Sequence, residues 1–130
     1  MTDALDIKQI INETVNMTIL KLKTAGLIKD NRKTANQKTE ELLRNYYAFC
    51  ESDEPYAKKI VEKIDTALER ISEDKYYDII PFYYFEKESR ESIAEYYDTT
   101  VTTVSRNKTR LLNVLKGYLF SDDVIYELFL

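Results

Sequence analysis

The sequence of 130 residues contains no histidine and no tryptophan, and only one cysteine, two glycines and two prolines. Without histidine, the chain lacks the commonest general base and the commonest zinc ligand. A single cysteine excludes an intramolecular disulfide and a cysteine-based zinc site. An all-β fold with many tight turns needs more glycine and proline, so the composition favours an all-α protein.

Long apolar runs and a signal peptide are also missing. No apolar run approaches the ~18 residues that a membrane-spanning helix needs, and the first residues lack the basic and apolar regions of a signal peptide. We therefore expect no membrane partner and a cytoplasmic location. No glycine-rich phosphate loop and no nucleophile–base spacing is present, so we expect no enzyme, no cofactor and no metal site.

Charge is distributed unevenly along the chain. The net charge of −4 argues weakly against nucleic-acid binding. However, residues 21–44 carry +4, residues 51–98 carry −7, and residues 99–116 carry +4 with no acidic residue. Salt screens charges beyond ~8–10 Å, so local charge governs attraction to phosphates. The basic residues of 21–44 are typical of a solvated helix face, whereas 99–116 belongs to a more informative pattern.

The first 33 residues are expected to form a helix followed by a basic connection. Thr2 or Asp3 can cap this helix, its apolar residues keep helical spacing, and Gly26 stands where a C-terminal cap is expected. The sequence leaves open whether this helix supports the rest of the chain or forms a homodimer.

Residues 34–72 are predicted to form a helical core region. Thr34 or Asn36 can start one helix, and the break at Ser52–Pro55 provides Asp53 or Glu54 as the cap of the next. The first helix has an apolar stripe that includes a cysteine, expected to be a small buried hydrophobe: Leu42, Leu43, Tyr46, Tyr47 and Cys50. The second helix has the clearest periodicity: Ala57, Ile60, Val61, Ile64, Ala67, Leu68 and Ile71.

Residues 74–85 are densely apolar and aromatic. A strand is compatible with this composition, but it would be solitary. A buried helix is favoured, with Pro81 as a kink or as a first-turn residue.

Residues 89–116 show the pattern of two helices joined by a tight turn. Ser89 can cap a short helix over 90–97, and Thr100 can cap a second helix over 101–116. Between them Asp98 stands where the chain needs a residue that tolerates left-handed geometry; glycine is best there, and aspartate is acceptable. Ala94 is small where the two helices approach each other, and Val104 is placed to pack back against the first helix.

This is the helix-turn-helix pattern, in which the second helix reads DNA in the major groove. An ordinary helical hairpin is the alternative, but it needs neither the cap at Thr100 nor an acid-free second helix. The buried side of the second helix is predicted to be Val104, Leu111, Leu112 and Leu115. The residues left available to a groove are Val101, Thr102, Ser105, Arg106, Lys108, Thr109 and Arg110, with Asn107 at the margin. Arginine can pair with guanine through two hydrogen bonds, threonine and valine methyls suit thymine, and hydroxyls and lysine suit phosphates.

Several short motifs surround the two predicted helices: Tyr84-Phe85-Glu86, Ser89, Ile93-Ala94-Glu95 and Val104-Ser105-Arg106. Together they resemble region 4 of bacterial sigma factors. Further segments extend the pattern toward the N-terminus: 34–47, Ile64-Asp65-Thr66-Ala67-Leu68 and Asp78-Ile79-Ile80. With them, residues 34–120 resemble small phage late-gene transcription regulators of the ArpU type.

The resemblance implies a sigma-like DNA-binding region at 73–120 in a phage or prophage regulator. Such a protein would act on double-stranded control DNA with host RNA polymerase, in the cytoplasm of a bacterial host. Asp98 stands where the family pattern usually has glycine. By position, the resemblance assigns the reading residues as Thr100, Thr102, Thr103, Ser105, Arg106 and Lys108.

Residues 121–130 are predicted to form a short capped helix that either folds back on the core or offers a surface to a partner.

Two other functions stay open. One is a small terminase-like DNA-recognition subunit of phage packaging, which would assemble into a ring. The other is a module that binds RNA polymerase without contacting DNA. A DNA reader would gain from dimerisation, because a dimer doubles the few contacts that one helix makes.

Overall fold

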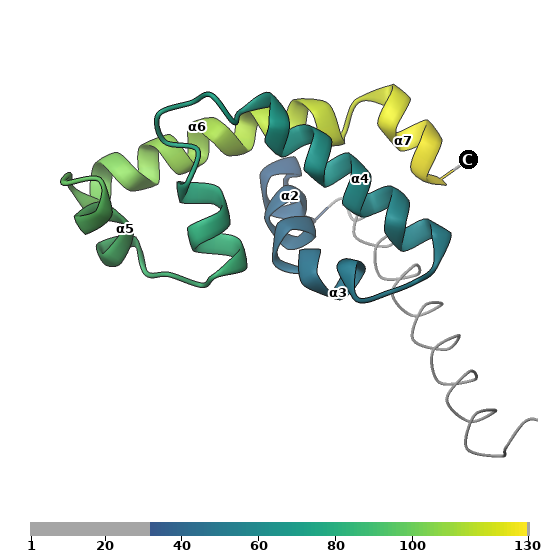
Figure 1. Cartoon of the computed structure of the whole chain (residues 1–130). Helices are drawn as coiled ribbons and strands as arrows, with labels where there is room; N and C mark the ends of the chain where they lie inside the picture. The colour runs from purple at the N-terminus through teal and green to yellow at the C-terminus, as the bar shows by residue number, and fades with distance from the viewer. Residues whose placement is uncertain (1–31, 130) are drawn as a thin grey trace, which may run out of the picture. The chain divides into compact units, whose positions relative to one another are not determined.

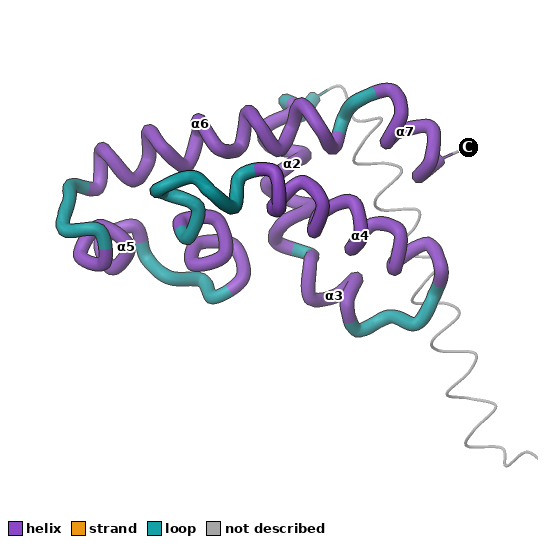
Figure 2. Tube along the Cα trace, turned by 45° about the horizontal axis from the view of Figure 1, so that its top comes forward, coloured by secondary structure: helices purple, strands orange, loops and turns teal. Residues whose placement is uncertain are grey.

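A computed structural model of the chain describes residues 32–129. The chain divides into two units, Met1–Lys33 and Thr34–Leu130, and the second contains nearly all of the described residues. The predicted first helix and its cap at Gly26 lie outside the described residues. Every regular element in the described part is helical, as Figures 1 and 2 show, which confirms the all-α prediction. No helix within residues 32–129 has the length and apolar character needed to cross a membrane.

The first described helix, α2 (Ala35–Arg44), begins as the sequence predicts. The Thr34 hydroxyl accepts a hydrogen bond from the Gln37 backbone N–H at 3.1 Å, and the Gln37 side chain accepts one from the Thr34 N–H at 2.8 Å. This reciprocal pair satisfies two backbone donors that a helix start otherwise leaves without partners. The short helix α3 (Tyr46–Cys50) follows after one residue.

The interruption between α2 and α3 makes the predicted apolar stripe wrong at two positions, Tyr47, which is 55% exposed, and Cys50. Asn45 ends α2, with its backbone N–H and its side-chain amide both donating to the Glu41 carbonyl, at 3.1 and 2.8 Å. Because the chain does not continue as one uniform helix, the inward position shifts by one residue. Phe49 is 1% exposed, whereas Cys50 is exposed instead of buried.

Helix α4 (Pro55–Arg70) has its cap residue at Glu54 and Pro55 at its first position. Proline suits this position because its missing N–H would have no helical partner there. The face predicted to be apolar is buried and packs against α3 and α6. Its buried residues are Ala57, Ile60, Ile64, Ala67 and Leu68, and Ile71 just beyond the helix is also buried.

The predicted helix over 74–85 is wrong in its first half. Residues 71–78 form consecutive turns, for example from the Tyr77 N–H to the Asp74 carbonyl at 3.0 Å. A π-helical turn, η1 (Pro81–Phe85), follows, with Pro81 in its first turn as expected. Between the turns and η1, Ile79 and Ile80 are helical and lie in the core at 0% exposure.

The last three helices are α5 (Arg90–Tyr96), α6 (Val101–Leu119) and α7 (Asp122–Phe129). Helix α6 is the longest of the helices within residues 32–129 and packs against α2, α4, α5 and α7 (Figure 1). Helix α7 folds back, since its Val124 and Leu128 are 3% and 8% exposed and it contacts both α4 and α6. An ion pair between Lys63 and Glu127 joins α7 to α4. Of the two alternatives for this segment, the structure shows packing within the chain.

Candidate nucleic-acid interface

The connection between α5 and α6 has the local geometry that the sequence predicts. The Ser89 hydroxyl accepts from the Ser92 N–H at 3.0 Å, and the Thr100 hydroxyl accepts from the Thr103 N–H at 3.2 Å, so both predicted caps are confirmed. Asp98 has a φ of 50°, the left-handed conformation expected at the turn. Helix α5 ends at Tyr96, one residue before its predicted end.

A small apolar cluster fixes α5 against α6. Ile79, Ile93, Ala94 and Val104 are buried together, with Val104 at 0% exposure. Ala94 and Val104 therefore meet as predicted, and burial of these side chains is worth about 1.5–3 kcal/mol for each larger one. Partly buried residues surround the cluster: Tyr76, Phe82, Tyr83, Tyr97 and Val101.

The outward face of α6 is formed by a line of polar residues, which we name the outward stripe: Thr102, Arg106, Thr109 and Asn113. All four are exposed, and their spacing of three or four residues keeps them on one side of the helix. Arg106 makes no hydrogen bond, ion pair or ring contact with the described part of the chain. Asn113 is the one member that the sequence analysis did not include. Its helical spacing, four residues after Thr109, is the signal that could have identified it.

One flank of α6 faces the aromatic segment and α5. The Lys108 ammonium lies over the Tyr83 ring, 4.2 Å from its centroid, and the side chain is half-buried. The Ser105 hydroxyl accepts from the Arg90 guanidinium at 3.1 Å, so Arg90 of α5 also reaches this flank. Val101 is half-buried against the apolar cluster. These side chains stand at the edge of the outward stripe rather than within it.

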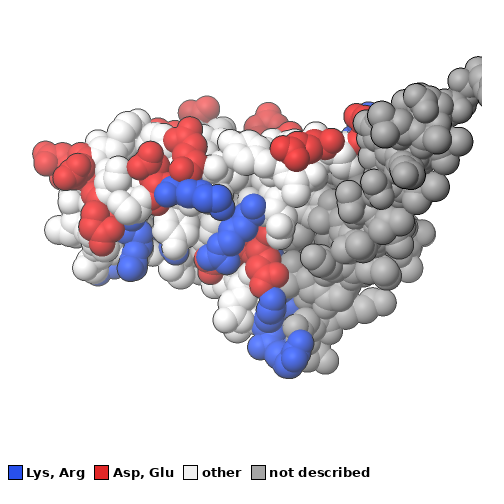
Figure 3. Space-filling view, turned by 90° about the horizontal axis from the view of Figure 1, so that it is seen from below, with Lys and Arg blue, Asp and Glu red and all other residues white. Residues whose placement is uncertain are grey.

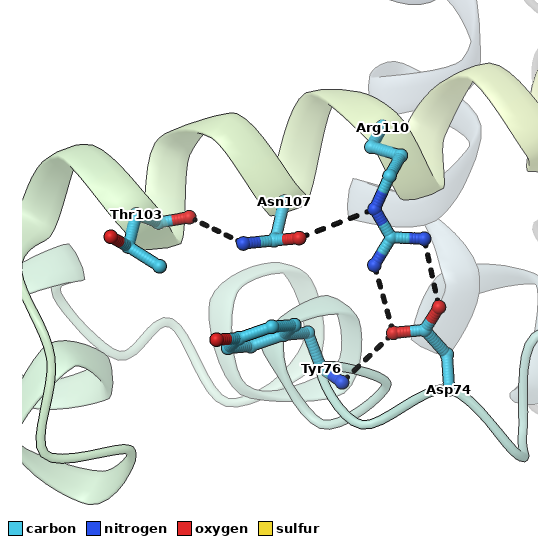
Figure 4. Close-up of polar contacts among 5 residues, drawn as sticks. All are labelled: Asp74, Tyr76, Thr103, Asn107 and Arg110. Atoms are coloured by element: carbon cyan, nitrogen blue, oxygen red, sulfur yellow. Dashed lines mark hydrogen bonds and ion pairs between the residues drawn. The ribbon is translucent and has the colours of Figure 1, made fainter.

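The other flank of α6 faces the turns at 71–78. Asn107 donates from its side chain to the Thr103 carbonyl at 2.9 Å, and the Thr103 hydroxyl is 3.1 Å from that of Thr100. Arg110 makes a two-pronged ion pair with Asp74, at 2.8 and 2.9 Å (Figure 4). The Arg110 hydrogen bonds are the main cause that lowers the pKa of the Asp74 carboxyl, and the same bonds raise the pKa of Arg110.

The predicted interface residues thus fall into three groups. Thr102, Arg106 and Thr109 face outward, Val101, Ser105 and Lys108 lie on the flank toward η1 and α5, and Thr100, Thr103, Asn107 and Arg110 lie at the helix start or on the flank toward 71–78.

Charge around this helix is mixed. Helix α6 carries four basic and no acidic residues, whereas exposed carboxylates flank it at Glu91 and Glu95 of α5 and at Asp98 of the turn. From below the view of Figure 1, on the side away from the top of α6, basic and acidic side chains are also interspersed (Figure 3). Attraction to phosphates would therefore depend on close approach by α6 itself, since salt screens more distant charges.

Comparisons with protein-family models, with curated proteins and with solved structures found no match for this chain.

Proposed function

We propose that this chain is a sequence-specific DNA-binding regulator of transcription that places α6 in the major groove of double-stranded DNA. The observation that carries the proposal is the pairing of a fixed α5–turn–α6 unit with an exposed, acid-free outward face on α6. A helix held in this way can enter the groove, because its outer side chains are not committed to packing. The residues that we expect to read base edges are Thr102, Arg106 and Thr109.

Arg106 is the expected principal base contact. Its guanidinium has five N–H donors that can pair with guanine through two hydrogen bonds, and within the described residues nothing holds it. Thr102 and Thr109 offer methyl and hydroxyl groups to thymine and to phosphates on either side. Lys108 and Ser105 on the flank are suited to phosphate contacts, provided that Lys108 leaves the Tyr83 ring.

The biological setting follows from the resemblance to sigma factor region 4 and to regulators of the ArpU type. We propose that the target is control DNA of phage or prophage late genes and that host RNA polymerase is the partner, in the cytoplasm of a bacterial host. A homodimer would double the contacts that a single α6 can make.

Selection of binding sites from a random duplex pool, at about physiological salt, tests the proposal. We expect one enriched motif, and a palindromic motif would indicate a two-fold dimer with a readable half-site spacing. Arg106→Ala should weaken binding to that motif by about 5- to 150-fold and relax the preference at one base pair.

Lys59→Ala is the matched control for Arg106→Ala, because it removes the same charge from an exposed position on α4. It should leave the motif unchanged. If the folded wild-type protein enriches no sequence, the proposed function is wrong. A ring-sized oligomer in light scattering would then favour the packaging role, and capture of RNA polymerase without DNA binding would favour the polymerase-binding role.

A further inference from the structure

We infer that Arg110 is a positioning residue that fixes the rotation of α6 about its axis, rather than a residue that contacts DNA. The inference rests on the proposed function for its DNA-binding test, but the contacts that carry it belong to the folded protein alone. They form a chain of hydrogen bonds from the 71–78 turns to the first half of α6 (Figure 4).

The Arg110 guanidinium uses three of its five N–H donors within the protein. Its two terminal nitrogens donate to the Asp74 carboxylate at 2.8 and 2.9 Å, and its Nε donates to the Asn107 side-chain oxygen at 3.2 Å. A planar guanidinium group that is hydrogen-bonded both to Asp74 and to Asn107 has little freedom to turn toward a phosphate. Arg106, one helical turn earlier, has no such hydrogen bonds to any residue that the structure describes.

Both ends of this chain of contacts are themselves anchored. Asp74 also accepts a hydrogen bond from the Tyr76 backbone N–H at 2.9 Å, and the Tyr76 ring packs on the Tyr97 ring with centroids 5.1 Å apart. At the other end, Asn107 donates to the Thr103 carbonyl at 2.9 Å. The contacts therefore connect two turns of α6 to a segment whose position is set by the core.

Rotation matters because successive residues of an α-helix point about 100° apart. A small turn of α6 about its axis would swing Arg106 and Thr102 sideways relative to the groove. The apolar side of α6 limits such a rotation, and the Asp74–Arg110 pair limits it on the flank where Asn107 lies. The pair also neutralises the Arg110 charge locally, so Arg110 should add little to phosphate attraction.

Asp74→Asn distinguishes positioning from DNA contact by the direction of its effect. If Arg110 contacts a phosphate, removing the Asp74 charge frees the arginine and removes a repulsive carboxylate, so DNA binding strengthens. If Arg110 positions α6, the same change weakens binding to the selected motif. We expect Asp74→Asn and Arg110→Gln each to lower the ratio of motif affinity to random-duplex affinity by about three- to tenfold.

The salt dependence of binding supplies the second readout. We expect Arg110→Gln to leave the slope of log affinity against log salt unchanged, whereas loss of a phosphate contact flattens it by about one unit. The double variant should lose no more than either single variant, because both remove one shared contact. Arg110→Lys keeps the positive charge but loses the planar group that makes two parallel hydrogen bonds to Asp74. We expect its DNA affinity and salt dependence to match those of Arg110→Gln. Stronger binding by Asp74→Asn, or a flatter slope for Arg110→Gln, would overturn the inference.

A double-mutant cycle on unfolding, measured by urea denaturation without DNA, separates this inference from the proposed function. We expect the effects of Asp74→Asn and Arg110→Gln on stability to be non-additive, which would support the positioning contact even if the wild-type protein selected no DNA sequence. Additive effects would show that the pair holds nothing in solution and would overturn the inference. Matching circular dichroism spectra would show that each variant is folded.

Discussion

Asp98 adopts the left-handed backbone conformation, with a φ of 50°, in the turn that connects α5 to α6. A residue with a Cβ is strained there, and glycine is not. We predict that Asp98→Gly raises the free energy of unfolding by about 0.5–1 kcal/mol, after the greater chain entropy of glycine is taken into account. Asp98→Ala is the control, because it removes the same charge without relieving the strain. Urea denaturation that shows equal effects of both substitutions would contradict this explanation.

At this scale, the sequence predicts local features well and distant contacts poorly. The caps at Thr34, Ser89 and Thr100 and the turn at Asp98 were predictable, because each depends on residues within three or four positions of it. The contact between Arg110 and Asp74 was not, because 36 residues separate the pair. Nothing in the composition of α6 indicates which of its arginines meets a carboxylate.

The side chain of Thr100 caps the N-terminus of helix α6. The Thr100 hydroxyl accepts from the Thr103 N–H, one of the backbone donors that a helix start leaves without a partner. We predict that Thr100→Ala lowers the free energy of unfolding by about 1 kcal/mol. Thr102→Ala, in the exposed outward stripe, should change stability by less than about 0.5 kcal/mol. Equal losses in thermal or urea unfolding would show that the cap contributes nothing specific.

The elements that the sequence mispredicts are those where a helix changes its geometry. Periodicity assumes one uniform helix, so the break at Asn45 shifted the inward position from Cys50 to Phe49. In the aromatic segment, the turns over 71–78 replace the first part of the helix that apolar density suggested, and the chain is helical from Ile79 through η1. For α4 and α6, which continue without interruption, the predicted apolar faces are the buried ones.

The packing of the described unit also raises the pKa of two tyrosines, Tyr97 and Tyr84, which no local pattern predicts. The pKa of Tyr97 is raised to about 12. Burial is the largest cause, the Asp78 carboxylate acts in the same direction, and the Asp78 backbone N–H opposes the shift. Burial likewise raises the pKa of Tyr84, whose hydroxyl donates to Glu40 of α2 at 2.9 Å. Such shifts require side chains from separate elements to close around each ring.

These raised pKa values predict how unfolding depends on alkaline pH. An unfolded tyrosine loses its proton near pH 10, whereas folded Tyr97 keeps its proton up to about pH 12. In that window the folded state binds more protons, so the free energy of unfolding falls as pH rises, and the contribution is complete only below about pH 10. We predict that Tyr97→Phe makes this fall less steep, in urea denaturation at a series of pH values between about 9 and 12.

Tyr126→Phe, at a side chain that is 65% exposed, is the matched control and should follow the wild-type curve. If both variants follow that curve, ionisation of Tyr97 is not coupled to unfolding, and the ring must be more accessible to solvent than its packing against Tyr76 implies.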